Sequence, residues 1–122
     1  KFNAAGTKQW TRTIGSNTTD YPKGVAMNAA GTNVFISGYT AGAVDGLTFL
    51  GSNDIVIAKY SAAGTKLWVR QVGTSAYEST DGGGSTVGPS GDAYIAGLTD
   101  SSFAGVTNAG STDFLLLRFN GN

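Results

Sequence analysis

Residues 59–73 read KYSAAGTKLWVRQVG, and residues 1–15 read KFNAAGTKQWTRTIG. The positions identical in both copies are the pairs Lys1/Lys59, Ala4/Ala62, Ala5/Ala63, Gly6/Gly64, Thr7/Thr65, Lys8/Lys66, Trp10/Trp68, Arg12/Arg70 and Gly15/Gly73. A third copy begins at Arg118 with RFNG. Repetition at a fixed period indicates an architecture in which each unit buries its apolar surface against neighbouring units.

The rest of the chain repeats as well, with a period that drifts from 58 to 60 residues because of small insertions. Each unit holds short segments that alternate in polarity or are continuously apolar, as β-strands do, and no segment has helical spacing. In the first unit we expect strands at Gly24–Met27, Val34–Thr40, Asp54–Tyr60 and Lys66–Val72. In the second unit we expect them at Gly84–Val87, Ala93–Thr99 and Asp113–Phe119, and Lys8–Ile14 is predicted as a further, half-polar strand.

Four antiparallel strands repeated at this period are typical of the blades of a β-propeller, so the predicted fold class is all-β. The smallest side chains belong at the crowded centre, which makes Gly24–Met27 and Gly84–Val87 the predicted inner strands. The strands that contain Trp10 and Trp68 would then be outermost. A repetitive β-sandwich or a β-solenoid is the alternative.

The chain resembles the SBBP β-propeller repeats of bacterial surface and secreted proteins. The resemblance covers nearly the whole chain and rests on the strand Asp54–Tyr60, the turn Gly64-Thr65-Lys66 with Leu67-Trp68, and the closing Gly73. The turn at Gly31 and the strand Phe35–Thr40 also fit the family's pattern, whereas Asp81–Gly88 (DGGGSTVG) departs from it. The Gly-Thr-Lys-x-x-Trp segment is similar to the tryptophan-docking motif of quinoprotein propellers. The family resemblance implies a location outside the cell or on a bacterial surface.

The repeats are offset from the ends of the sequence, and it begins inside a repeat at Lys1, so we expect an excised or processed piece. Residues 1–15 then supply the outer strand of a blade shared with a partner chain, 24–73 form a complete blade, and 84–120 form three strands of a second. Two blades cannot close a ring, which needs about four to eight. We therefore expect cyclic self-assembly, with three copies giving six blades or four copies giving eight. The alternative is a fragment of a longer propeller chain.

Composition limits the possible functions. The 122 residues carry eight basic and eight acidic side chains, so no surplus of Lys and Arg favours a nucleic-acid partner. No apolar run approaches the roughly 18 residues of a membrane-spanning helix, and we expect no membrane insertion. The absence of His and Cys removes imidazole and thiolate chemistry. We expect no enzyme activity, no cofactor and no metal.

Few residues qualify as candidates for a site. Asp54 and Asp113 share a repeat position at the start of a strand, where a carboxylate is expected to bind backbone N–H groups of a turn. Asp45 and Asp100 are weak ligand-binding candidates because they are not repeated and lie in the loops Ala41–Asn53 and Asp100–Thr112.

The remaining signature residues are predicted to serve packing. In the first of these loops, Leu47, Phe49 and Leu50 are expected to turn inward. Trp10 and Trp68 are predicted to be packing elements, and Arg70, two residues beyond Trp68 on the same strand face, is expected to cover its ring. The predicted function is a non-enzymatic scaffold or binding module. A lectin-like carbohydrate-binding ring and a quinoprotein-like enzyme remain as alternatives.

Overall fold

The computed structural model describes residues 1–81 and 84–121, which form strands, turns and extended segments. The strands are β1 (Asp20–Met27), β2 (Asn33–Thr40), β3 (Asp54–Ser61), β4 (Lys66–Val72), β5 (Glu78–Ser79), β6 (Ser85–Val87), β7 (Ala93–Thr99) and β8 (Asp113–Phe119). These ranges contain no helix that could cross a membrane. The all-β, antiparallel prediction is confirmed.

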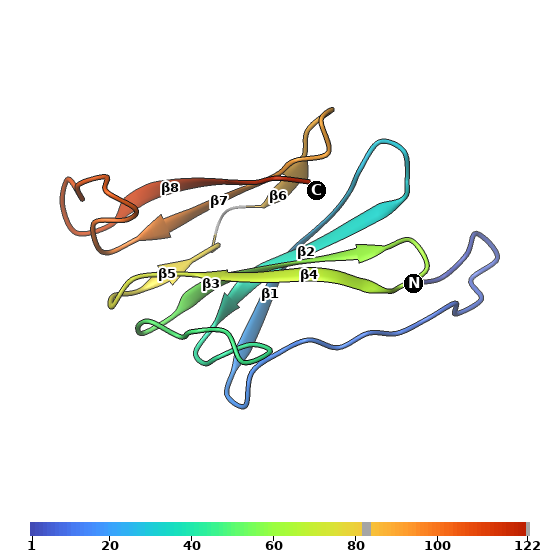
Figure 1. The fold of residues 1–122 in the computed structure, drawn as a ribbon, viewed down its shortest axis with the longest axis horizontal. Helices are drawn as coiled ribbons and strands as arrows, with labels where there is room; N and C mark the ends of the chain where they lie inside the picture. Colours follow the sequence, from blue (N-terminus) through green and yellow to red (C-terminus); the bar gives the residue numbers. More distant parts are fainter. Residues whose placement is uncertain (82–83, 122) are drawn as a thin grey trace.

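The first sheet has the strand order β1-β2-β3-β4, so the chain crosses it from one edge to the other (Figure 1). Its inner strand is longer than predicted, because β1 begins at Asp20, which pairs with Thr40. A bulge between Pro22 and Gly24 then shifts the register of the pairing with β2. The prediction missed this part because the residues before the bulge look like a polar connection, and only pairing with β2 makes them a strand.

The second sheet repeats this order without an outer strand. β8 pairs with β7 along its whole length, and the opposite edge of β7 carries both β5 and β6. The inner strand is therefore divided into two pieces, within the region where the sequence departs from the repeat pattern. Part of that region, residues 82 and 83, lies outside the described ranges. The three predicted strands of this unit are confirmed to within one residue at their ends.

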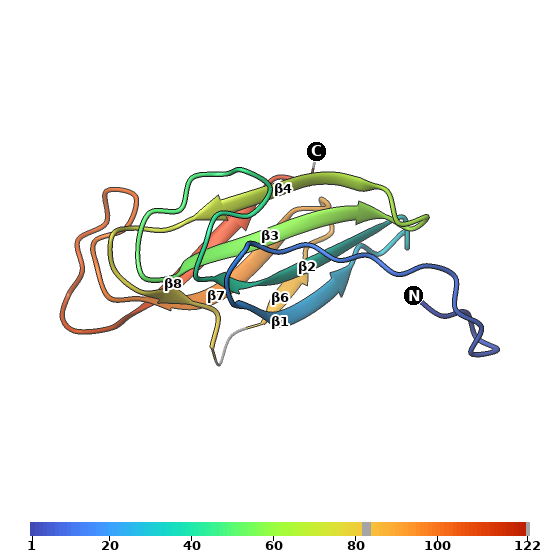
Figure 2. The same cartoon turned by 90° about the horizontal axis from the view of Figure 1, so that it is seen from below.

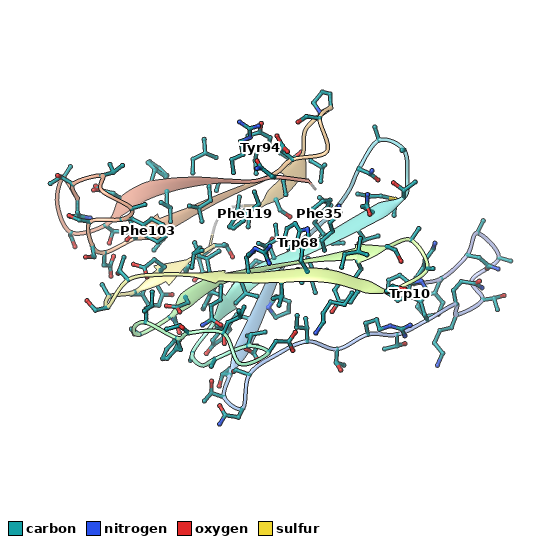
Figure 3. The ribbon with its side chains drawn as sticks, in the orientation of Figure 1. Trp10, Phe35, Trp68, Tyr94, Phe103 and Phe119 are labelled. Atoms are coloured by element: carbon teal, nitrogen blue, oxygen red, sulfur yellow. The ribbon has the colours of Figure 1, made fainter. Side chains whose placement is uncertain are left out.

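The two sheets pack face to face, as Figures 1 and 2 show. The buried cluster between them consists of Phe35, Ile55, Ile57, Ala93 and Ile95. Trp68, Val72, Val87, Leu115, Leu117 and Phe119 pack against this cluster. In Figure 3 the rings of Phe35, Trp68 and Phe119 meet in the space between the sheets. Most of the core thus comes from residues at every second position of facing strands.

Residues 8–14 do not form the strand that was predicted. Apart from an isolated bridge between Phe2 and Lys8, the segment is extended and has no ladder partner. It runs across the face of the first sheet that lies away from the second sheet (Figures 1 and 2). A strand exists only when its N–H and C=O groups bind a neighbouring edge, and this segment has none beside it in the single chain.

The loop before β3 also differs from expectation. Its most buried apolar residue is Val44, at 1% exposure, and the Val44 N–H donates to Gln71 of β4 over 2.9 Å. Leu50 stays 53% exposed, whereas Leu47 and Phe49 are half-buried. Which apolar residue of a loop turns inward depends on where the loop crosses its sheet, and the order of residues does not contain that information.

Candidate assembly interface

The outer face of the second sheet carries large apolar side chains exposed to solvent. Phe114 is fully exposed and Leu116 is 73% exposed, although they occupy the repeat positions of Ile55 and Ile57, which are 0% exposed. The difference arises because the second sheet covers Ile55 and Ile57, whereas no element of the described chain covers Phe114 and Leu116. Apolar surface of this kind typically marks a contact site.

The first sheet also has a face turned away from the second sheet, and the N-terminal segment covers part of it (Figures 1 and 2), so that Ala58 there is 0% exposed. Ile36 and Ala58 lie on it and line a cavity of about 230 Å³, together with Ile14 from the N-terminal segment. Ile36 and Ala58 occupy the repeat positions of Ile95 and Leu117, which form part of the contact between the sheets. The face of each sheet that is turned away from the other sheet is therefore the repeat equivalent of the face that the other sheet buries. Such opposite surfaces suit a head-to-tail contact, which is repeated from copy to copy.

The N-terminal segment packs against the turn between β3 and β4. The indole N–H of Trp10 donates to the carbonyl of Ala62 over 3.1 Å, and Nε of Arg12 donates to the carbonyl of Gly64 over 2.7 Å. Gly64 has a φ of 86° and faces the indole so closely that a Cβ there would lie 2.9 Å from the ring. Figure 3 shows Trp10 beside this turn, apart from the core aromatics.

These contacts resemble those of the outer strand β4. The Arg12 guanidinium lies 5.8 Å from the Trp10 ring centre, and that of Arg70 lies 5.3 Å from the Trp68 ring centre. In both segments the arginine also donates to the carbonyl of the residue before it. The predicted stacking of Arg70 on Trp68 is therefore confirmed, and Arg12 and Trp10 show the same arrangement. The segment thus has the local geometry of an outer strand and lacks only a ladder partner.

Two fully buried carboxylates mark the junction between the sheets. Asp54 accepts from the Leu50 N–H over 3.0 Å and from Gln71 over 2.9 Å. Glu78 accepts from the N–H of Thr74 and from the hydroxyl of the same residue, each over 2.6 Å. Sequence reasoning included both carboxylates among the candidates but assigned a turn-binding role to Asp54 and none to Glu78. The signal was present, because Glu78 follows Gly73 by five residues as Asp20 follows Gly15.

Gly73 gives this junction its close fit. A Cβ at Gly73 would lie 2.1 Å from Oδ1 of Asp54 and 3.0 Å from Oε2 of Glu78. The same arrangement begins at Gly15, where a Cβ would lie 2.5 Å from a carboxylate oxygen of Asp20. The Asp54 equivalent in the second unit is Asp113, which accepts from the Ala109 N–H over 2.6 Å. Asp20 and Asp113 thus each repeat one half of the arrangement at Gly73.

The remaining aspartates have local partners. Asp45 forms an ion pair with Lys66, and Asp100 accepts from the Thr112 hydroxyl over 2.7 Å. Each of these two candidates for ligand binding thus already interacts with a side chain of the same chain. Lys23 lies 2.5 Å from Asp81 and holds the pKa of that carboxyl below its usual value. Burial raises the pKa of Tyr39, whose hydroxyl donates to Asp81 over 3.1 Å.

Two further observations concern a metal site and the comparison with known proteins. Within residues 1–81 and 84–121, no three His, Cys, Asp or Glu side chains gather closely enough to hold a metal ion. No family model and no curated protein matches the chain. The likeness to SBBP repeats therefore stays a prediction, and the functional argument depends on the geometry described above.

Proposed function

We propose that this protein is a non-enzymatic scaffold that assembles head to tail with copies of itself into a closed β-propeller. Each four-stranded sheet serves as a blade, and residues 8–14 of one copy complete the second sheet of the preceding copy by pairing with its β8. Three copies would give six blades and four would give eight. The location that we propose, from the resemblance alone, is a bacterial surface or the extracellular space.

The observation that carries this proposal is the contrast between equivalent positions. Phe114 and Leu116 are exposed where Ile55 and Ile57 are completely buried. The contact between the two sheets of one chain therefore supplies a template for the contact between chains. Within one chain, the face of the first sheet that carries Ile55 meets the face of the second sheet that carries Ile95. In the proposed contact between chains, the face that carries Phe114 meets the Ile36 face of the next copy in the same way.

The pairing of β3 with β4 supplies the register for the exchanged strand. Ile57 pairs with Arg70, and Lys59 pairs with Trp68. The corresponding pairs between chains are Leu116 with Arg12, and Arg118 with Trp10. Within one chain, Asp54 lies beside Gly73 and Glu78. Closure of the ring would likewise place Asp113 of one copy beside Gly15 and Asp20 of the next copy.

Measurement of the molar mass by light scattering tests the assembly. A ring has three or four times the 12.4 kDa of the chain. A species that stays at 12.4 kDa up to millimolar concentration would contradict the proposed assembly.

Cysteine cross-linking tests the register, because the chain has no Cys of its own. We expect Arg12→Cys chains mixed with Leu116→Cys chains to form an interchain disulfide on mild oxidation. Directly opposed residues on paired strands have the Cβ spacing that a disulfide tolerates. Mixing Arg12→Cys with Val106→Cys is the matched control, since Val106 is 73% exposed but lies outside β8. Equal cross-linking of both mixtures would contradict the proposed register.

A further inference from the structure

The first residues of the chain occupy part of the edge where a neighbour would have to pair. Phe2 forms an antiparallel bridge with Lys8. The Gln9 N–H donates to the Lys1 carbonyl over 2.8 Å, and the amino group of Lys1 donates to the Trp10 carbonyl over the same distance. Residues 1–10 thus form a small hairpin, which we call the N-terminal hairpin.

The N-terminal hairpin repeats the end of the β3–β4 hairpin bond by bond. Tyr60 pairs with Lys66 as Phe2 pairs with Lys8, at positions 58 residues apart. The N–H of Ser61 donates to the carbonyl of Thr65 over 2.8 Å. The corresponding bond from Asn3 to Thr7 is 3.0 Å long. Lys1 and Phe2 therefore correspond to Lys59 and Tyr60, near the end of β3.

The lysines that begin these copies also bind in equivalent ways. Nζ of Lys1 donates to the carbonyl of Ala62 over 3.1 Å. Nζ of Lys59 donates to the carbonyl of Gly121, which is the repeat equivalent of Ala62. Each lysine thus binds the turn of the following unit. In a ring, the residue of the preceding copy that reaches the carbonyl of Ala62 would be Arg118.

Residues 1–5 (KFNAA) and residues 118–122 (RFNGN) are copies of the same repeat positions. Two chains joined in the register described above would bring both copies to one place. We propose that residues 1–4 hold the place of the neighbour's residues 118–121, and that they are displaced when the ring closes. This inference rests on the proposed function and adds to it a built-in competitor that opposes assembly.

The N-terminal copy is the one that yields, because the described part of the C-terminal copy is held more firmly. Arg118 pairs with Tyr94 in the ladder and forms an ion pair of 2.6 Å with Asp92. The Gly121 N–H donates to the same carboxylate over 2.9 Å. By contrast, Phe2 is 65% exposed. The N-terminal hairpin can therefore release its first residues without opening either sheet.

A chain that lacks residues 1–4 tests this inference. We expect the concentration at half-assembly to fall by at least about tenfold, because several backbone hydrogen bonds no longer need to break before the neighbour pairs. Sedimentation over a concentration series measures this shift. An unchanged or higher concentration would overturn the inference.

A reversible lock provides the second test and uses the complete chain. In the Phe2→Cys/Lys8→Cys variant, a disulfide closes the N-terminal hairpin across its bridging pair. We expect the oxidised form to remain a monomer and the same sample to assemble after reduction, while reductant leaves the unmodified chain unchanged. Equal assembly in both redox states would overturn the inference and leave the ring intact. If the unmodified, truncated and reduced chains all stay monomeric, it is the proposed function that fails.

Discussion

Charge placed on the free face of β8 is expected to block assembly and leave the single chain folded. The change is the double variant Phe114→Asp/Leu116→Asp. Both side chains are exposed in the single chain, at 104% and 73%, so little burial is lost in the monomer. In the proposed ring they become as buried as Ile55 and Ile57, which are 0% exposed.

The size of the effect follows from this change in burial. Covering an apolar side chain of this size contributes about 1.5–3 kcal/mol, so two contribute about 3–6 kcal/mol at each contact between chains. Every 1.4 kcal/mol is a factor of ten, so the dissociation constant of one contact is expected to rise by about 100-fold or more. The two introduced carboxylates would add a desolvation cost.

Sedimentation and thermal unfolding together give the readout. We expect the double variant to sediment as a monomer at concentrations where the unmodified chain forms rings, with unfolding of the monomer unaltered. Leu50→Asp is the matched control, because Leu50 is 53% exposed and lies in the loop before β3, outside β8. The reasoning is refuted if the double variant assembles as the unmodified chain does, or if Leu50→Asp disrupts assembly equally.

Three further predictions concern the stability of the single chain. Gly73→Ala should lower the free energy of unfolding, measured by urea titration, by about 1–3 kcal/mol, because the added Cβ overlaps two buried carboxylates. Gly110→Ala is the control and should change this free energy little, because no atom lies within 4 Å of its added Cβ. Phe35→Ala should cost about 3–5 kcal/mol in the same assay, because Phe35 is 1% exposed in the core; a loss under 1 kcal/mol would contradict the face-to-face packing of the sheets. The Gly121 N–H, with Arg118, keeps the pKa of Asp92 below its ordinary 3.8. The ionised Asp92 therefore stabilises the folded chain fully above about pH 4, and this stabilisation is lost as the pH falls through the pKa of Asp92 in the folded state. Amide exchange at the end of β8 should accelerate in that acid range, and Asp92→Asn should abolish this pH dependence.

Much of the strand pattern could be predicted because its signals are local. The apolar run Asp54–Tyr60 and its copy Asp113–Phe119 become β3 and β8, and Val34–Thr40 falls within β2. The repeated Gly6 and Gly64 both adopt positive φ, at 75° and 86°, in the turns that their copies predict. Turn chemistry and alternation depend on residues close in sequence, so a single sequence is enough to locate them.

Two parts of the candidate interface could not be predicted in this way. Glu78 is as buried as Asp54, but its role becomes clear only when the sheets bring it to Gly73. The contrast between Phe114 and Ile55 likewise depends on which face another sheet covers. Burial is a property of the packed pair of sheets, so two residues at the same repeat position can differ completely in exposure.

The amino-acid sequence by itself determined the repeat, its period and the all-β class, since these follow from residue types at fixed spacings. Only the tertiary structure decided that residues 8–14 stay unpaired, that β1 starts at Asp20, and which faces remain open. The physical reason is that a strand is completed by the hydrogen bonds of its neighbour and a core by the surface that covers it. Both partners lie far away in the chain or, as we propose, in another copy of it.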